Sequence, residues 1–582
     1  MVVSAGISIV SCFSHTPRYQ GYKGLGSVSV SWLYLHFTTL LIRRYFVHFF
    51  KALPAATATT NSIFSSIPIS NWYSNPLPSS LFLSSLSPLF NQKGGEGTAD
   101  TVHCNQDMIA NSAICVGIEH RFYGSSLPSI EDGGGNNKNL DLGLSVEANA
   151  LDTVAVLQKV QSMFPVKNSS VPRPVVNFGG SYSGATATWF RMAFPDSTDG
   201  AISSSGVVNA IYNFVEFDEV IAEAINTPDQ WCADRVYHIT NAIDDLFDLG
   251  VEEANRVKGI FNATNLVETN HGDTDFMYMV ADGFSMIDQY GGKKELCDGL
   301  RSVEDWETDE VKITNLADIL KKHFGDEYGQ DCYYDSECLR VENDMSPKPG
   351  LMGSQNSRSW RWQKCSQVAY LQAHPESYSL RSKLLTLESL EDQCEYVYGQ
   401  VPARDGGNKE LNDKFGAARP DTAGATNVFS ISYSDDPWKA ASVTSHDLGE
   451  TLPYCYTECD GCGHCGSGVT DVDAPTCGVP QSEFINMVLA EARFEGTYSD
   501  PNHPGTDRVV DVAVGSNIVN VSGFDIDENG EKVSWGPLSA TVDKTEIVVD
   551  FSPKGGPSDL TGHWDAELRS IVWADGNAWP MK

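Results

Sequence analysis

The chain has 582 residues, of which 76 are acidic and 40 basic, so its formal net charge is −36. Such a surface repels a phosphate backbone, which excludes nucleic acid as a partner. The length exceeds what one hydrophobic core supports, and two or three domains are expected.

The first 95 residues contain no aspartate or glutamate and are rich in serine. An apolar run from Val28 to Ile42 is marginal in length for a membrane span, and two arginines follow it. This composition fits a targeting leader, a membrane anchor or a mis-predicted exon. We assign residues 1–40 to such a leader or unreliable segment.

Residues 174–194 read as a buried strand, a tight glycine turn and a helix with a serine at the apex. This is the pattern of a nucleophile elbow in an α/β-hydrolase. A serine hydroxyl is a weak nucleophile until a base removes its proton, and the turn presents Oγ to base and substrate alike. Ser181 is the predicted nucleophile because Gly179 and Gly180 precede it. Ser183 stands where the strict motif has glycine, and a turn centred on Ser183 would put Ser181 at a glycine position.

The acid and the base of a triad follow the serine in this fold, in that order. His464 is the favoured base because it lies in a loop rich in glycine and cysteine, whereas His446 reads as a surface residue. The acid is Asp436 or its neighbour Asp435, which follow an apolar strand and precede a proline. An aspartate there can turn toward a histidine loop and orient the Nδ1–H group.

Two backbone donors are expected for the oxyanion. One is the N–H group of Tyr182, directly after the nucleophile. The other is assigned to the glycine-rich turn that contains Gly95 and Glu96, where small residues allow close backbone approach. The charged run 119–121 ends a buried strand and is predicted to support the site structurally through ion pairs.

The segment 209–420 shows apolar residues at helical spacing, in the runs 209–225, 233–261 and 311–329. After residue 496 the pattern changes to short strands separated by turns, which predicts a small antiparallel barrel or sandwich. Four tryptophans of this last segment are expected to fill its core, with a glycan-binding face as the alternative: Trp535, Trp564, Trp573 and Trp579.

The predicted fold class is therefore α/β: an α/β-hydrolase core with an inserted helical cap and a separate small C-terminal all-β domain. The expected division is a leader at 1–40, the first part of the core at 41–208, the helical cap at 209–420, the second part of the core at 421–495 and a β-rich accessory domain at 496–582.

Fourteen cysteines argue against a reducing cytosol. Cys459, Cys462 and Cys465 could hold zinc, but a liganded His464 could not act as a base, so we predict no metal and no cofactor. These cysteines are instead expected to form disulfides among themselves or with Cys455 and Cys477. Three sequons, at Asn168, Asn262 and Asn520, are candidate glycosylation sites.

Several of these motifs together resemble one family of serine peptidases. The stretches 119–128 and 179–184, the Asp436-Pro-Trp438 break and the Gly463-His464 pair are similar to lysosomal Pro-X carboxypeptidase, dipeptidyl peptidase II and thymus-specific serine protease. The resemblance covers roughly residues 91–495, and residues 42–47 resemble the family's first sheet strand. It implies Ser181 as nucleophile, Asp436 as acid and His464 as base, with Asp435 as a rival acid because the chain departs from the pattern before Asp-Pro-Trp.

The resemblance implies a serine exopeptidase that cleaves next to proline through an acyl-enzyme, beneath a cap that limits access to chain ends. Trp362, Gln367 and Trp438 are candidates for the substrate pocket. Gln367 stands where many members have a glutamate, and an uncharged amide cannot clamp an N-terminal ammonium, which favours a carboxypeptidase over a dipeptidyl aminopeptidase. The rival interpretation is a non-peptidase hydrolase or an inactive binding protein on the same fold.

The expected partners are peptides with proline near a terminus, with glycan contact by the C-terminal segment and a homodimer as further hypotheses. The acidic composition and the cysteines favour the secretory pathway, with a lysosomal, vacuolar or extracellular destination.

Overall fold

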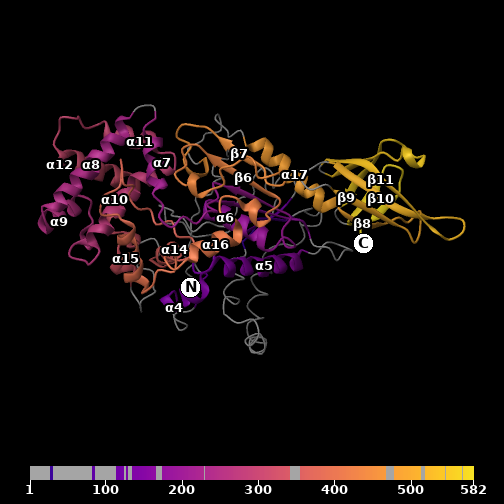
Figure 1. The fold of residues 1–582 in the computed structure, drawn as a ribbon, viewed down its shortest axis with the longest axis horizontal. Helices are drawn as coiled ribbons and strands as arrows, with labels where there is room; N and C mark the ends of the chain where they lie inside the picture. Colours follow the sequence, from indigo (N-terminus) through magenta and orange to yellow (C-terminus); the bar gives the residue numbers. More distant parts are fainter. Residues whose placement is uncertain are drawn as a thin grey trace, which may run out of the picture.

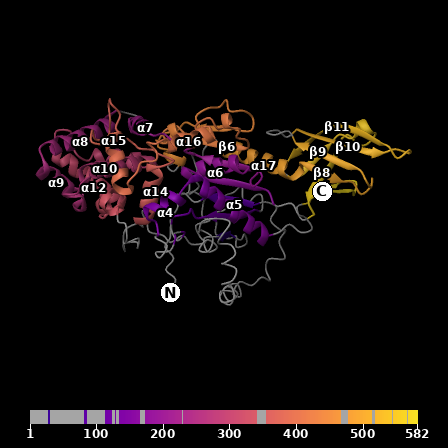
Figure 2. The same ribbon diagram turned by 60° about the horizontal axis from the view of Figure 1, so that its bottom comes forward.

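The computed structural model describes residues 113–123, 126, 128, 134–164, 173–227, 230–340, 354–466, 477–512, 518–543, 545–565 and 568–582, with two short strands, β1 (Ser27–Ser29) and β2 (Leu81–Ser85). Helices gather at one end of the molecule, a parallel sheet lies in the middle, and a second sheet forms the other end (Figures 1 and 2). The candidate strand at 42–47 and the oxyanion candidates Gly95 and Glu96 lie outside the described residues.

The central sheet has seven parallel strands in the order β1-β3-β2-β4-β5-β6-β7. The other five strands are β3 (Ile114–Ile118), β4 (Val175–Gly180), β5 (Gly200–Ser204), β6 (Val428–Tyr433) and β7 (Tyr454–Thr457). Every residue of β3, β5 and β6 is buried, because parallel strands are covered on both faces. The predicted mixed α/β class with a parallel sheet is confirmed.

Helices cover both faces of this sheet. Val175 of β4 packs in one cluster with α5 (Val146–Met163) and with α6 (Tyr182–Ala193). A short helix, α4 (Asn137–Gly143), comes just before α5 in the chain. The next residue, Val176, faces the opposite way and packs against α17 (Gly478–Phe494). This alternation follows from the two-residue period of a strand and fixes which face of β4 each helix covers.

The chain between β5 and β6 forms the helical insertion, residues 216–415, shown in magenta to orange in Figure 1. Its described α-helices are α7 (Glu216–Ile225), α8 (Trp231–Asp248), α9 (Val251–Ile260), α10 (Gly272–Gln289), α11 (Lys293–Leu300), α12 (Asp309–Phe324), α13 (Ser336–Leu339), α14 (Ser354–Cys365), α15 (Leu387–Tyr398) and α16 (Gly407–Phe415). Two disulfides join these helices, Cys232–Cys297 and Cys365–Cys394, and a third, Cys332–Cys338, joins the 3-10 turn Cys332–Tyr334 to α13.

The predicted helical run 233–261 is interrupted. α8 ends at Asp248 and α9 begins at Val251, with Gly250 between them at a φ of 116°. This region of backbone space favours glycine, so the single residue without a Cβ turns one apolar-periodic run into two helices. Periodicity alone did not reveal the break, because the apolar spacing continues on both sides.

The C-terminal sheet is antiparallel, with neighbouring strands in sequence order from β8 to β15. Its strands are β8 (Gly496–Ser499), β9 (Asp507–Val512), β10 (Ile518–Ile526), β11 (Lys532–Asp543), β12 (Glu546–Val549), β13 (Leu560–Asp565), β14 (Ser570–Trp573) and β15 (Ala578–Pro580). A bridge between Tyr498 and Met581 joins the two outer strands, which makes the sheet barrel-like. Trp573 and Trp579 are buried in its core, as core filling predicts, and Trp535 and Trp564 pack against it.

One helix belongs to two cores. The middle of α17 packs on the parallel sheet through Phe484, Ile485 and Val488, while Phe494 at its end is buried in the core of the C-terminal sheet. The two sheets are therefore joined by shared apolar packing as well as by the chain. Among the described residues, no helix is both long and apolar enough to cross a membrane.

Candidate active site

Ser181 lies between the end of β4 and the first turn of α6, with φ 59° and ψ −132°. A non-glycine residue with positive φ is strained, and strain of this kind gathers at functional sites. The turn is tight: a Cβ on Gly179 would lie 2.0 Å from the backbone oxygen of Ser183. Glycine is thus required two residues before Ser181, whereas the serine at position 183 fits.

His464 contacts the carboxylate of Asp436. Its Nδ1 lies 2.8 Å from Oδ1 and 2.9 Å from Oδ2, and the two side chains are 2% and 0% exposed. The backbone N–H of Trp438 donates a second hydrogen bond of 2.8 Å to Asp436 Oδ1 and fixes the carboxylate. The other ring nitrogen, Nε2, is buried with no hydrogen-bond partner among the described residues.

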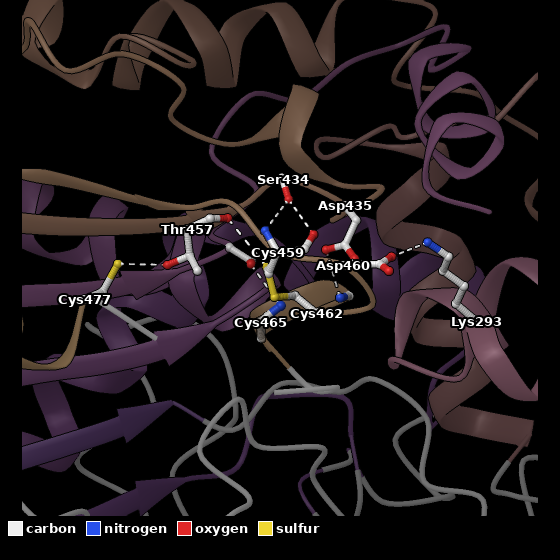
Figure 3. Close-up of a disulfide and its surroundings, with 11 residues drawn as sticks. Lys293, Ser434, Asp435, Thr457, Cys459, Asp460, Cys462, Cys465 and Cys477 are labelled. Carbon is white, nitrogen blue, oxygen red and sulfur yellow. Dashed lines mark hydrogen bonds and ion pairs between the residues drawn. A yellow bond between two sulfur atoms is a disulfide. The ribbon is translucent and has the colours of Figure 1, made fainter. Parts of the chain in front are cut away.

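Three consecutive residues after β6 hold the loop 459–464, and Figure 3 shows the first two of them. The Ser434 hydroxyl accepts the N–H of Cys459 and donates to the Cys459 carbonyl, both at 2.9 Å. Asp435 accepts the N–H of Gly463 at 3.1 Å, and Asp436 meets His464. Burial raises the pKa of Asp435. The two rival acids therefore do different things: one holds the backbone of the loop, and the other contacts the imidazole.

Disulfides also brace this loop. Cys459 pairs with Cys462, as predicted, and Cys465 is disulfide-bonded too. Cys455 and Cys477, expected as partners for these cysteines, pair with each other. The Asp435 carboxylate and the two sulfurs of the first pair lie within 4.8 Å of one another. Both sulfurs are consumed by the disulfide, so this group offers no thiolate to a metal ion.

The nucleophile candidate and the histidine loop meet at the same edge of the sheet. The N–H of Ser181 donates to Ser204 O at the end of β5, at 2.9 Å. Cys465 directly follows His464, and its N–H donates to the Oγ of Ser205, the residue after Ser204, at 3.0 Å. Because parallel strands end at one edge, the ends of β4, β5 and β6 bring together residues that are up to 283 positions apart in the chain (464 − 181).

The three pocket candidates lie in different surroundings. The Trp438 ring centroid is 6.0 Å from that of His464, and the indole packs against Phe217 and Tyr370. Trp362 is buried in the helical insertion against Tyr398. Gln367 accepts the N–H of Val146 and donates to Glu147, both at 2.9 Å, so its amide ties the insertion to the start of α5.

The run 119–121 takes part in internal pairing. Ser126 donates to Glu119 at 2.6 Å, and Arg121 pairs with Asp152 on α5 at 2.8 Å. Burial lowers the pKa of His120 to about 4, and its Nε2 lies 3.4 Å from the Tyr182 hydroxyl.

Contacts between the helical insertion and the site were missed by sequence reasoning. Gln363 of α14 donates to the Tyr182 hydroxyl at 2.6 Å. The Trp438 indole N–H donates to Gln289 at the end of α10, at 2.9 Å. Both glutamines lie in helices whose sequence carries no catalytic pattern, and the single available signal was that Gln363 follows the pocket candidate Trp362.

Comparisons with known proteins place the chain in a family. Residues 73–473 match the family model of serine carboxypeptidase S28. A probable serine protease EDA2 of Arabidopsis thaliana is 29% identical over 64% of this chain and 69% of its own length. Thymus-specific serine protease of Mus musculus is 25% identical over 63% of this chain and 73% of its own length. Lysosomal Pro-X carboxypeptidase of the same organism is 23% identical over 58% and 67%. The chain therefore belongs to the serine carboxypeptidase S28 family and is a serine peptidase.

Proposed function

We propose that this peptidase is an exopeptidase that cleaves next to proline through an acyl-enzyme intermediate on an α/β-hydrolase core. The observation that carries the proposal is the buried His464–Asp436 pair. The Nε2 of His464 has no hydrogen-bond partner among the described residues, and its loop is tied to the same sheet edge as the strained Ser181. The chain order of serine, aspartate and histidine is that of the α/β-hydrolases.

The chemistry follows from this arrangement. His464 Nε2 takes the proton of Ser181 Oγ as Oγ attacks the scissile carbonyl, and it later gives that proton to the leaving amine. Asp436 accepts the Nδ1–H bond, which fixes the tautomer and stabilises the imidazolium. Water then attacks the acyl-enzyme: His464 Nε2 takes the proton of the water and returns it to Ser181 Oγ as the acyl group leaves.

The oxyanion needs donors that exist before the reaction. Tyr182 is the first residue of α6, so its backbone N–H has no carbonyl partner within the helix. The group lies at the N-terminal, positive end of the helix dipole. We assign it as one donor and keep Gly95 and Glu96 as the other. Gln363 and His120 surround the Tyr182 side chain and hold this residue in place.

Recognition of proline is assigned to the aromatic surface beside the base. The Trp438 ring lies next to His464, and we assign its indole as the apolar surface that packs on the pyrrolidine ring. We assign Trp362 to the wall supplied by the helical insertion, which acts as the cap. The Gln367 amide is hydrogen-bonded to Val146 and Glu147 of α5, and it offers no carboxylate to the ammonium group of a peptide. This favours release of a C-terminal residue.

The proposed location is an acidic or extracellular compartment of the secretory pathway. The relatives include proteins named lysosomal Pro-X carboxypeptidase and probable extracellular serine carboxypeptidase. The disulfides of the insertion and of the histidine loop suit an oxidising environment.

Two peptides test the specificity at acidic pH. One is blocked at its N-terminus and ends in Pro-Phe, and the other is an unblocked Lys-Pro amide reporter. Release of phenylalanine from the first supports the carboxypeptidase, and turnover of the second alone shows a dipeptidyl aminopeptidase. Turnover of neither, without fluorophosphonate labelling, would remove the proposed catalysis.

A further inference from the structure

The end of α10 carries a buried carboxyl group outside the proposed triad. Asp288 is 4% exposed, and its Oδ2 has no hydrogen-bond partner among the described residues. A buried carboxylate without donors is costly, so this position favours the protonated, neutral form.

The charged groups whose electrostatic fields act on Asp288 are mostly acidic. Asp435 and Asp436 come from the segment after β6, Asp460 comes from the loop 459–464, and Lys293 begins α11. Lys293 is paired with Asp460, and Figure 3 shows this pair close to Asp435. The Asp460 side chain is 62% exposed. Lys293, the one cation among these groups, is therefore already paired with Asp460, and ionisation of Asp288 would add a third negative charge to those of Asp435 and Asp436.

The same end of α10 lies directly against the histidine loop. A Cβ on Gly463 would be 2.4 Å from Gln289 O and 2.9 Å from Gly291 N, so the two backbones are in close contact next to His464. Gln289 also accepts the indole N–H of Trp438. A displacement of the end of α10 at Asp288 would therefore move both the loop that carries His464 and the Trp438 ring beside it.

We infer that Asp288 is a positioning residue of the proposed triad, which in its protonated form lets the end of α10 close on the loop that carries His464. When Asp288 ionises, repulsion from Asp435 and Asp436 drives the two segments apart, and His464 loses its place against Asp436. This inference rests on the proposed function, and it adds an alkaline limit that the triad alone does not impose.

The direction of titration agrees with this role. Burial, and next the charge of Asp435, raise the pKa of Asp288 well above its ordinary value of 3.8. A folded-state pKa above the unfolded one means that the closed form binds the extra proton. The contact between the end of α10 and the loop 459–464 is then fully stabilised below the pKa that Asp288 has in the unfolded chain. It weakens as the pH rises through the pKa that Asp288 has in the folded protein, which suits an enzyme that works in acid.

The test compares Asp288→Asn with Asp298→Asn, which removes one exposed carboxylate on the neighbouring helix α11. The second-order rate of fluorophosphonate labelling at Ser181 is measured from about pH 4.5 to pH 8. Removing the ionisation should raise the ratio of the rate at about pH 7.5 to that at about pH 5 by about five-fold or more over wild type, and the control should not. Asp288→Leu, neutral at every pH, should shift the ratio the same way if the asparagine variant folds poorly.

Profiles of Asp288→Asn and Asp288→Leu that superimpose on wild type would overturn the inference while leaving the proposed catalysis intact. A wild-type protein that is not labelled at any pH would instead overturn the proposed function. The two failures are therefore distinguishable in one experiment.

Discussion

His464 Nδ1 lies within hydrogen-bond distance of both carboxylate oxygens of Asp436, at 2.8 and 2.9 Å, in a site where both side chains are buried. This geometry leaves Nε2 as the nitrogen that can exchange a proton with a hydroxyl. A buried carboxylate also favours the imidazolium that would form during the reaction. The pair joins β6 to the loop after β7, so it forms only when the sheet is complete.

Replacing Ser181 by alanine should abolish fluorophosphonate labelling and peptide turnover, because no other hydroxyl occupies the apex of the turn. Ser183→Ala is the matched control: the residue lies two positions later, in the first turn of α6, and is also buried. Its labelling should stay within about three-fold of wild type, since surrounding contacts change little. Labelling that survives in Ser181→Ala but disappears in Ser183→Ala would contradict this prediction and identify Ser183 as the nucleophile.

Asp436→Asn should lower kcat by about 10⁴-fold, because the amide stabilises the wrong tautomer of His464. Asp435→Asn changes the neighbouring residue in the same way, but the amide Oδ1 still accepts the Gly463 N–H. A charge-assisted hydrogen bond becomes a neutral one, so the change should cost about 1 kcal/mol of stability and far less activity. Steady-state kinetics and thermal unfolding of the two variants separate these effects. Equal losses of kcat would contradict the assignment of Asp436 as the acid.

The disulfide between Cys459 and Cys462 should matter for activity more than for global stability. Closing so short a loop contributes about 2 kcal/mol, yet the bond braces the residues directly before His464. We expect a Cys459→Ser/Cys462→Ser variant to exchange amide hydrogens faster at 459–464 and to lose at least about ten-fold in kcat. The short disulfide Cys332–Cys338 in the helical insertion provides the control, and its serine variant should keep the loop's exchange rate unchanged.

Phe494→Ala should destabilise the contact between the two sheets by about 3–5 kcal/mol, because the ring is fully buried in the C-terminal core at the end of α17. Val479→Ala at the other end of the same helix should change stability by less than about 0.5 kcal/mol, since that side chain is 69% exposed. Thermal unfolding followed by intrinsic tryptophan fluorescence measures both. A small effect of Phe494→Ala would mean that the two sheets fold independently of this packing.

Local sequence determined the elements that depend on neighbouring residues. The glycine pair before Ser181 specifies the tight turn, because a Cβ at Gly179 collides with the backbone there. The apolar strand runs predict buried strands, and the close spacing of Cys459 and Cys462 suits a short disulfide. Each of these features is decided by the residue types within a few positions, which is why they can be read from the chain.

The tertiary structure alone decided the rest. Asp435 and Asp436 are identical residues side by side, and only the direction of the backbone after β6 makes one hold Gly463 and the other meet His464. Gln289 lies against Gly463 although the two are 174 positions apart in the chain (463 − 289), and nothing in α10 marks it or its neighbour Asp288 as different from packing residues. Sequence patterns record local geometry, whereas the meeting of distant segments depends on how the whole sheet and the helical insertion pack.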